Sequence, residues 1–266
     1  MKQVITKKIN YFNLKQSVVN FSKKVIPFSI RFFLRKANWK RMYYQDILFR
    51  KLDGDVYCPI ANKTFKTFPR DITPSNGARS RHRLFWIFIE KETDILVKEN
   101  SLLHFAPEYG IRQKFKKFIN LTYVPADKMV NGYDYHKGIQ NVDLLNINFK
   151  DNFFDYIICN RVLEHIVDDK KAMSEMYRVL KIGGTALITV PLDYNLEKTH
   201  ESYVSRKDRI KYYGQWDHVR MYCADIKNRL EDVGFSVVLN KYSNNFSKEE
   251  MKKFGLCVDT IIIAKK

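Results

Sequence analysis

The feature that most constrains this chain is the alternation of strand-like and helix-like segments from residue 101 onward. Apolar runs typical of strands stand at 102–106, 121–127, 154–160 and 185–192. Segments with a helical spacing of apolar residues lie between them, at 111–119 and 168–180. This alternation predicts an α/β fold with a parallel sheet, helices on both faces, and ligands at the carboxyl ends of the strands.

The rest of this region fits the same architecture. A short strand is expected at 141–145, and a helix at 224–234 that Gly234 ends. The last two strands are expected at 235–242 and 256–266. Asp168 is expected to cap the helix that follows it, and the run KIGG (181–184) to turn the chain after that helix.

The positive charge is concentrated at the amino terminus. The net charge is +18, and residues 1–51 hold 13 Lys or Arg against one acid, which is +12. Basic and large apolar residues mix at 14–45, and Pro27 is expected to interrupt a helix there. This pattern predicts basic amphipathic helices, packed either on the main domain or on an anionic membrane surface. Because the body of the chain carries only +6, a nucleic-acid partner is disfavoured.

Four cysteines lie far apart, which does not indicate a disulfide framework, and no secretory signal or bilayer-spanning run is visible. A cytoplasmic protein is expected, with peripheral contact at the inner face of the membrane through residues 14–45. Composition shifts divide the chain into an arm (1–52), a small strand-and-turn unit with a linking helix (53–98), and the α/β domain (99–266).

The turn after the first expected strand reads HFAPEYG (104–110). It retains one glycine, and Glu108 would repel a diphosphate, which argues against NAD and ATP. The same acid suits a cofactor that carries a sulfonium and an ammonium group. Asp127 ends the second strand, where it can accept from both ribose hydroxyls, and Asp143 ends the third, where it can accept from an adenine amino group.

The segment 145–193 resembles the central part of class I S-adenosylmethionine-dependent methyltransferases. It contains Phe154-Asp155, Leu163-Glu164-His165 and Leu180-Lys181-Ile182-Gly183-Gly184 in that family's order. The resemblance covers about 100–265 and implies a Rossmann-like fold with a seven-stranded, mostly parallel sheet and S-adenosyl-L-methionine as cofactor. It implies cofactor contacts at His104, Ala106, Pro107, Glu108, Gly110, Asp127, Asp143, Leu144 and Asn160.

One branch of that family has the same H-F-A-P-E turn, a downstream G-Q-W-D-H-V-R segment (here 214–220), and a small zinc unit with four cysteines before the main domain. Only Cys58 remains here of the four thiols, so the resemblance implies that this zinc site is lost, and we expect no metal. Packing of Tyr57, Ile60, Phe65 and Phe68 on the next helix should hold the unit instead. The basic residues that follow, Arg79, Arg81, His82 and Arg83, are expected either in solvent or facing an anionic substrate.

Methyl transfer to a hydroxyl needs an aligned acceptor and a base near the cofactor. His165 follows the fourth strand, and Asp217 and His218 lie in the polar segment after the fifth. We expect His218 as base or orienter, Asp217 as its partner and His165 nearby, the alternative being packing or capping for His165 and a surface loop for His218. The expected substrate contacts are Gln215, Trp216 and Arg220, and residues 195–214 are long enough for a substrate loop.

The leading interpretation is an S-adenosylmethionine-dependent O-methyltransferase. The resemblance suggests a glycan, a lipid-linked sugar or a small metabolite as acceptor. The alternatives are an RNA methyltransferase, motivated by the charge, and an inactive methyltransferase-fold scaffold, motivated by the lost zinc ligands.

Overall fold

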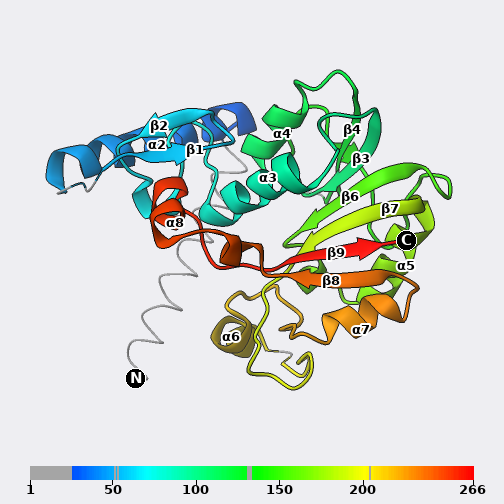
Figure 1. Ribbon diagram of the computed structural model, residues 1–266. Helices are drawn as coiled ribbons and strands as arrows, with labels where there is room; N and C mark the ends of the chain where they lie inside the picture. Colours follow the sequence, from blue (N-terminus) through cyan, green and yellow to red (C-terminus); the bar gives the residue numbers. More distant parts are fainter. Residues whose placement is uncertain (1–25, 51, 53, 131–133, 204) are drawn as a thin grey trace.

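The protein, described here from a computed structural model over residues 26–50, 52, 54–130, 134–203 and 205–266, is built around one seven-stranded sheet (Figure 1). Its strands run in the order β5 (Gln140–Asn141), β4 (Leu121–Asp127), β3 (Asn100–Phe105), β6 (Phe154–Asn160), β7 (Leu180–Thr189), β9 (Ile261–Lys265) and β8 (Ser236–Asn240). All pairs are parallel except those of β9, which is antiparallel to both of its neighbours. The predicted fold class is confirmed.

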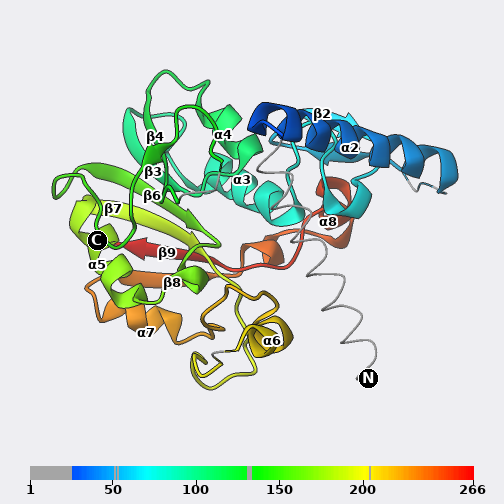
Figure 2. The same cartoon turned by 180° about the vertical axis from the view of Figure 1, so that it is seen from behind.

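Helices cover both faces of the sheet (Figures 1 and 2). On one face α5 (Asp169–Val179) and α7 (Ile226–Glu231) contribute to a core that contains Met173, Met176 and Leu230. On the other face α3 (Ser80–Glu92) and α4 (Tyr109–Phe115) contribute to a second core that contains Trp86 and Phe115. The sheet is therefore buried on both sides, as its apolar strands predict.

Two local predictions have different outcomes. Asp168 caps α5 as expected, since its side chain accepts from the Lys171 N–H at 2.9 Å. The expected turn at 181–184 is wrong, because β7 already begins at Leu180. The β6–β7 register shifts between Phe154 and Tyr156, and Gly183 takes a positive φ of 79°. The glycines therefore lie in an irregular part of the strand and not in a turn between a helix and a strand.

The basic arm includes one long helix, α2 (Phe28–Phe49), which begins directly after Pro27. The other helix expected in the arm falls before residue 26, outside the described residues. Phe32 of α2 packs on the rings of Tyr109 and His136, with centroids 4.7 and 4.5 Å apart. None of the helices among the described residues is both long and apolar enough to cross a membrane.

The small unit before the sheet is a hairpin of β1 (Val56–Cys58) and β2 (Lys63–Phe65), followed by η1 (Pro69–Asp71). Ile60, Phe65 and Phe68 pack in the same core as α3, as predicted. The Cys58 sulfur accepts hydrogen bonds from the Ala61 N–H and the Thr73 hydroxyl, both at 3.4 Å. Side-chain packing and hydrogen bonds therefore hold this unit.

Arg83 of α3 connects this unit to the C-terminal part of the chain, where η4 (Tyr242–Asn245) and α8 (Lys248–Phe254) lie. It is fully buried, and its guanidinium donates to Asp71, to Thr73 and to the carbonyl oxygens of Phe254 and Gly255. The expectation that Arg83 lies in solvent or faces a substrate is wrong, because its guanidinium group is buried and donates to groups of the protein itself.

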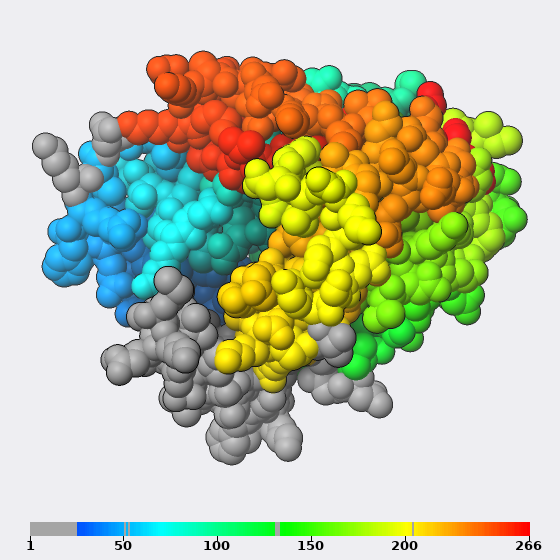
Figure 3. All heavy atoms as spheres, turned by 90° about the horizontal axis from the view of Figure 1, so that it is seen from below, coloured from blue at the N-terminus to red at the C-terminus, as the bar shows by residue number. Residues whose placement is uncertain are grey.

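The segment between β7 and α7 lies on the surface, between the N-terminal unit and α7 (Figure 3, yellow). It contains the short helices α6 (Arg206–Asp208) and η3 (Arg209–Tyr213). Two isolated bridges, Leu192 to Tyr222 and His200 to Met221, join its ends. They bring residues 214–220 back toward the sheet, beside η2 (Leu163–His165), the turn that follows β6.

Candidate active site at the carboxyl ends of the strands

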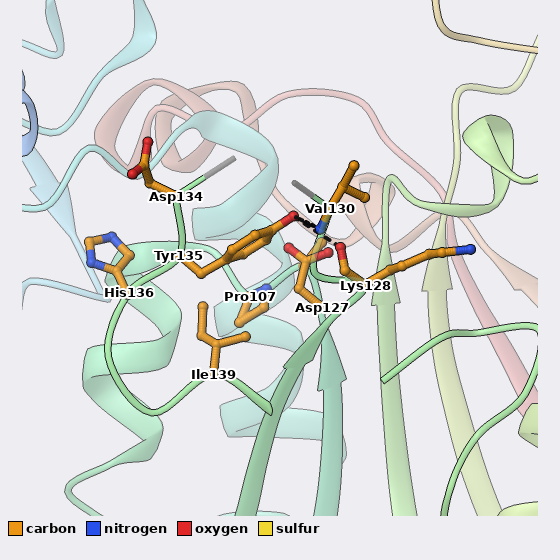
Figure 4. A pocket seen from close by; sticks show the side chains of 9 residues that line it. Pro107, Asp127, Lys128, Val130, Asp134, Tyr135, His136 and Ile139 are labelled. Carbon is orange, nitrogen blue, oxygen red and sulfur yellow. Dashed lines mark hydrogen bonds between the residues drawn. The ribbon is translucent and has the colours of Figure 1, made fainter. Parts of the chain in front are cut away.

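A cavity of about 450 Å³ lies at the carboxyl ends of β3 and β4 (Figure 4). It is lined by Ala106, Pro107, Asp127, Lys128, Val130, Asp134, Tyr135, His136 and Ile139. Three of the residues expected to contact a cofactor, Ala106, Pro107 and Asp127, are among them. Its position is that of a ligand site in an open parallel sheet.

Asp127 is the only residue of β4 that lines the cavity. Among the described residues no side chain donates a hydrogen bond to its carboxylate, and burial raises its pKa. The Tyr135 hydroxyl accepts from the Val130 N–H at 3.1 Å and donates to the Lys128 carbonyl at 2.9 Å (Figure 4), so it is not a donor to Asp127. Asp127 is thus a half-buried carboxylate of the cavity, and a backbone hydrogen bond from Lys128 lowers its pKa by less than burial raises it.

Glu108 lies between two histidines and is hydrogen-bonded to one of them. Its Oε2 lies 3.1 Å from Nε2 of His104, and its Oε1 lies 3.7 Å from Nε2 of His82. Burial would raise the pKa of Glu108, but the His104 hydrogen bond and the histidine charges outweigh it and lower that pKa to about 2. Burial lowers the pKa of His82 to about 4, so at neutral pH the His104 hydrogen bond holds the Glu108 carboxylate.

The turn between β3 and α4 brings Glu108 next to β6. Ala106 adopts a positive φ of 45°, which is uncommon for a residue with a side chain and often marks a functional turn. The Asn160 amide donates to Glu108 Oε1 at 3.4 Å. The ends of three adjacent strands, β4, β3 and β6, therefore carry Asp127, Glu108 and Asn160 along one edge.

Other expected cofactor residues lie around the cavity rather than in its lining. Asp143 forms an ion pair with Lys128 at 2.7 Å, and Leu144 next to it is buried. His104 is fully buried under Glu108. Gly110 packs against the strand-and-turn unit, since a side chain there would meet Ile60 and Asn76 at 3.3 Å. Contact of these four residues with a cofactor stays a prediction.

The expected catalytic residues come together from two segments. The rings of His165, from η2, and His218, from the segment after β7, are 4.8 Å apart in an edge contact. His218 Nδ1 lies 2.8 Å from the Tyr213 carbonyl oxygen, which can only accept, so Nδ1 carries the proton and Nε2 a free lone pair. His165 Nδ1 lies 3.5 Å from Asp217 Oδ2. Asp217 is therefore beside His165 rather than the direct partner of His218.

The residues expected to bind substrate differ in what they contact. Arg220 is 3% exposed and donates to the carbonyl oxygens of Leu163, Ile166 and Val167, which anchors η2. This favours a positioning role over substrate contact. Gln215 donates to Asp217 at 3.0 Å, and Trp216 stacks under Arg206 at 4.7 Å, so both lie at the outer edge of the histidine pair.

Sequence reasoning missed Glu164 as a functional residue. It is 2% exposed, and its Oε2 makes no hydrogen bond among the described residues. Two positive side chains, Arg161 and Arg81, lie near enough to influence its pKa, yet burial dominates and raises that pKa to about 7. The LEH run shows Glu164 next to His165 in the sequence. Only the tertiary structure shows that Glu164 is buried.

Burial of Glu164 predicts a pH effect on stability. Below pH 4.5 the group is protonated in both states, so wild type and Glu164→Gln should differ by a constant amount. Between pH 4.5 and about 7 the unfolded chain is ionised while the folded one is still protonated, so over this range wild type should lose about 3 kcal/mol relative to Glu164→Gln, and above pH 7 the difference should again be constant. Urea unfolding at several pH values in metal-free buffer would measure this, and parallel curves would contradict it.

The strand order defines an open, mostly parallel α/β sheet, and the cavity lies at the carboxyl ends of two of its strands. Residues 112–188 match a family model described as "Methyltransferase domain". This match covers less than a third of the chain, and that part of the chain is similar to methyltransferase domains.

Several curated proteins are similar to parts of the chain. Phosphoethanolamine N-methyltransferase 2 of Caenorhabditis elegans is 30% identical over 94 residues, which is 35% of this chain and 20% of that protein. The ubiquinone/menaquinone biosynthesis C-methyltransferase UbiE of Klebsiella pneumoniae is 30% identical over 120 residues, covering 38% and 48%. The chain thus spans less than half the length of these relatives.

Solved structures show a weaker likeness. An S-adenosylmethionine-dependent methyltransferase from Archaeoglobus fulgidus has 16% identity and a TM-score of 0.47, covering 69% of this chain and 93% of that one. Phosphoethanolamine N-methyltransferase 2 of Haemonchus contortus, bound to S-adenosyl-L-methionine, has 18% identity and a TM-score of 0.45, covering 68% and 51%.

Proposed function

We propose that this protein binds S-adenosyl-L-methionine in the cavity at the ends of β3 and β4 and transfers its methyl group to a hydroxyl. The observation that carries this proposal is the Asp127 carboxylate, half-buried in the cavity with no side-chain donor among the described residues. Two ribose hydroxyls would supply the missing donors. Glu108 and Asn160, at the ends of the next two strands, would then hold the part of the cofactor that carries its ammonium and sulfonium charges.

The acceptor would lie beside the histidine pair. When bound, the cofactor supplies an electrophilic methyl group. The lone pair on His218 Nε2 can accept the proton of an attacking hydroxyl, because Nδ1 is held by the Tyr213 carbonyl. Asp217, close to His165, can stabilise the positive charge that results.

The surroundings of this pair favour an acidic acceptor. Arg81 is half-buried and has no described ion pair, and burial together with the charge of Arg161 lowers its pKa. The Nε atoms of both arginines are buried and without a partner among the described residues. An acceptor with a carboxylate or phosphate, as in an acidic glycan, a lipid-linked sugar or a small metabolite, would satisfy them.

Calorimetric titration with S-adenosylhomocysteine tests the proposal, using NAD as a control ligand. Binding of the first and not of the second would support it, whereas a folded protein that binds neither would favour the inactive-scaffold interpretation. The RNA methyltransferase alternative predicts instead that methyl transfer requires RNA and ceases after ribonuclease treatment.

We also propose that α2 holds the protein at an anionic membrane surface. One face of α2 contacts the rim of the cavity through Phe32 and the Arg31–Asp134 ion pair. The opposite face is exposed and mixes apolar with basic residues, namely Ile30, Phe33, Leu34, Ala37, Lys40, Arg41, Tyr44 and Leu48. This composition suits the headgroup region of a bilayer that contains acidic lipids.

Vesicle flotation tests this membrane contact. We expect binding to vesicles that contain phosphatidylglycerol, weaker binding in high salt, and a loss of about tenfold in the double variant Phe33→Ser, Leu48→Ser. Val258→Ser, which changes an exposed apolar residue outside α2, is the matched control. Equal binding by the double variant and wild type would show that this face of α2 does not insert.

A further inference from the structure

Three side chains with metal-ligating atoms meet next to the turn that follows β6. They are Glu164 and His165, from the turn after β6, and His218, from the segment after β7. One ligand atom from each lies within 4.8 Å of the other two. The cluster is closed in by protein, since Glu164 and His218 are buried and His165 is half-buried. No exposed group of acids is involved.

One ring nitrogen of each histidine has a neighbour outside this cluster. His218 Nδ1 donates to the Tyr213 carbonyl at 2.8 Å, and His165 Nδ1 lies 3.5 Å from the Asp217 carboxylate. No hydrogen bond to Nε2 of either ring is found in the described part of the chain. Metal-binding histidines characteristically donate their second ring N–H to a backbone carbonyl or a carboxylate, which fixes the tautomer and orients the ligand nitrogen.

Glu164 supplies the independent observation. Its Oε2 is buried and, among the described residues, has no hydrogen-bond donor. Buried carboxylate oxygens normally have a partner, so an unpaired oxygen on a side chain that also lies beside two histidines points to a ligand that the protein itself does not provide. Arg161, although near, is engaged with Asp259 at 2.6 Å.

We propose that Glu164, His165 and His218 bind one divalent transition-metal cation such as Zn²⁺. Two imidazoles and one carboxylate suit Zn²⁺ and its first-row neighbours, whereas Mg²⁺ and Ca²⁺ prefer ligand sets made only of oxygen. Three protein ligands leave a coordination position open to a substrate oxygen. The sequence-based expectation was that no metal binds, because only Cys58 of the four thiols remains. The proposed site differs from that expectation and uses other residues.

The catalytic meaning of this site rests on the proposed function. An acceptor hydroxyl at the open position would lose its proton to Asp217, and from there to water, because a bound cation lowers the hydroxyl pKa. The oxygen lone pair would form the new O–C bond while the C–S bond pair returned to sulfur, releasing S-adenosylhomocysteine. With the cation bound, His218 is a ligand, and the cation takes over its role of activating the hydroxyl.

The test is a spectroscopic titration of the full-length, chelator-treated protein with Co²⁺, followed by competition with Zn²⁺. We expect one Co²⁺ per chain, with visible absorption bands that Zn²⁺ abolishes. Glu164→Gln and His218→Asn should each weaken binding by more than about tenfold. His136→Asn, a histidine at the rim of the cavity, is the matched control and should leave the metal affinity unchanged.

Calorimetric titration of the same samples with S-adenosylhomocysteine separates the two proposals. Cofactor binding without Co²⁺ binding would overturn the metal site and leave the proposed function intact. Co²⁺ binding that both variants retain would place the ion elsewhere and also overturn the assignment. Metal binding lost in the variants, without cofactor binding, would support the site and refute the proposed function. His165→Gln replaces either variant that fails to fold by circular dichroism.

Discussion

The Asp127→Ala variant should bind S-adenosylhomocysteine at least about 100-fold more weakly than wild type. Asp127 is the one carboxylate of β4 in the cavity, and it has no side-chain partner among the described residues. Hydrogen bonds to a charged acceptor contribute about 1.5–3 kcal/mol each, so the loss of two ribose contacts corresponds to at least about 2.7 kcal/mol. Isothermal titration calorimetry measures this difference directly.

Stability separates a lost contact from a lost fold in that experiment. Burial disfavours the Asp127 carboxylate, as its raised pKa shows, so Asp127→Ala should unfold at the same temperature as wild type or higher. Asp232→Asn, an exposed acid at the end of α7, is the control and should bind normally. Wild-type affinity in Asp127→Ala would move the ribose site away from β4.

Replacing Arg83 with methionine should be the most destabilising single change proposed for this protein. Arg83 is fully buried, forms a 2.6 Å ion pair with Asp71, and lies 3.9 Å above the Phe68 ring. Its removal leaves the Phe254 and Gly255 carbonyl oxygens without this donor, while Asp71 keeps its hydrogen bonds from Ser80. Leaving a buried acceptor unpaired costs about 1–3 kcal/mol. Urea unfolding of the full chain measures the loss.

The neighbour Arg79 provides the matched control. It lies one turn earlier, as the exposed N-cap of α3, so Arg79→Met should change the free energy of unfolding by less than about 1 kcal/mol. Arg83→Lys keeps the charge but loses the planar group of donors, and should fall between wild type and Arg83→Met. If Arg83→Met unfolded like Arg79→Met, the small unit would not depend on this connection.

Most strands of the sheet and the acidic residue at the end of β4 were predictable from local sequence, whereas the strand expected at 141–145 is wrong, since β5 is only Gln140–Asn141. The run 154–160 is apolar enough to specify a buried strand, and the structure places β6 at those residues. β4 likewise ends at Asp127 as expected, because strand length and hydrophobicity are properties of the segment itself. The turn predicted from the glycines at 183 and 184 is wrong. These glycines lie in a register irregularity of β7, which depends on the pairing of β7 with β6.

The candidate active site depends more on tertiary structure. The sequence by itself determined the α/β class, Asp127 at a strand end, and the histidines 165 and 218 as candidates. Only the tertiary structure decided that those histidines touch, that Glu164 is buried between them without a hydrogen-bond donor for Oε2, and that Arg83 is an internal connector. The physical reason is that burial and pairing depend on contacts between segments up to 172 residues apart. Local sequence does not indicate which distant side chain will shield a charged group from water.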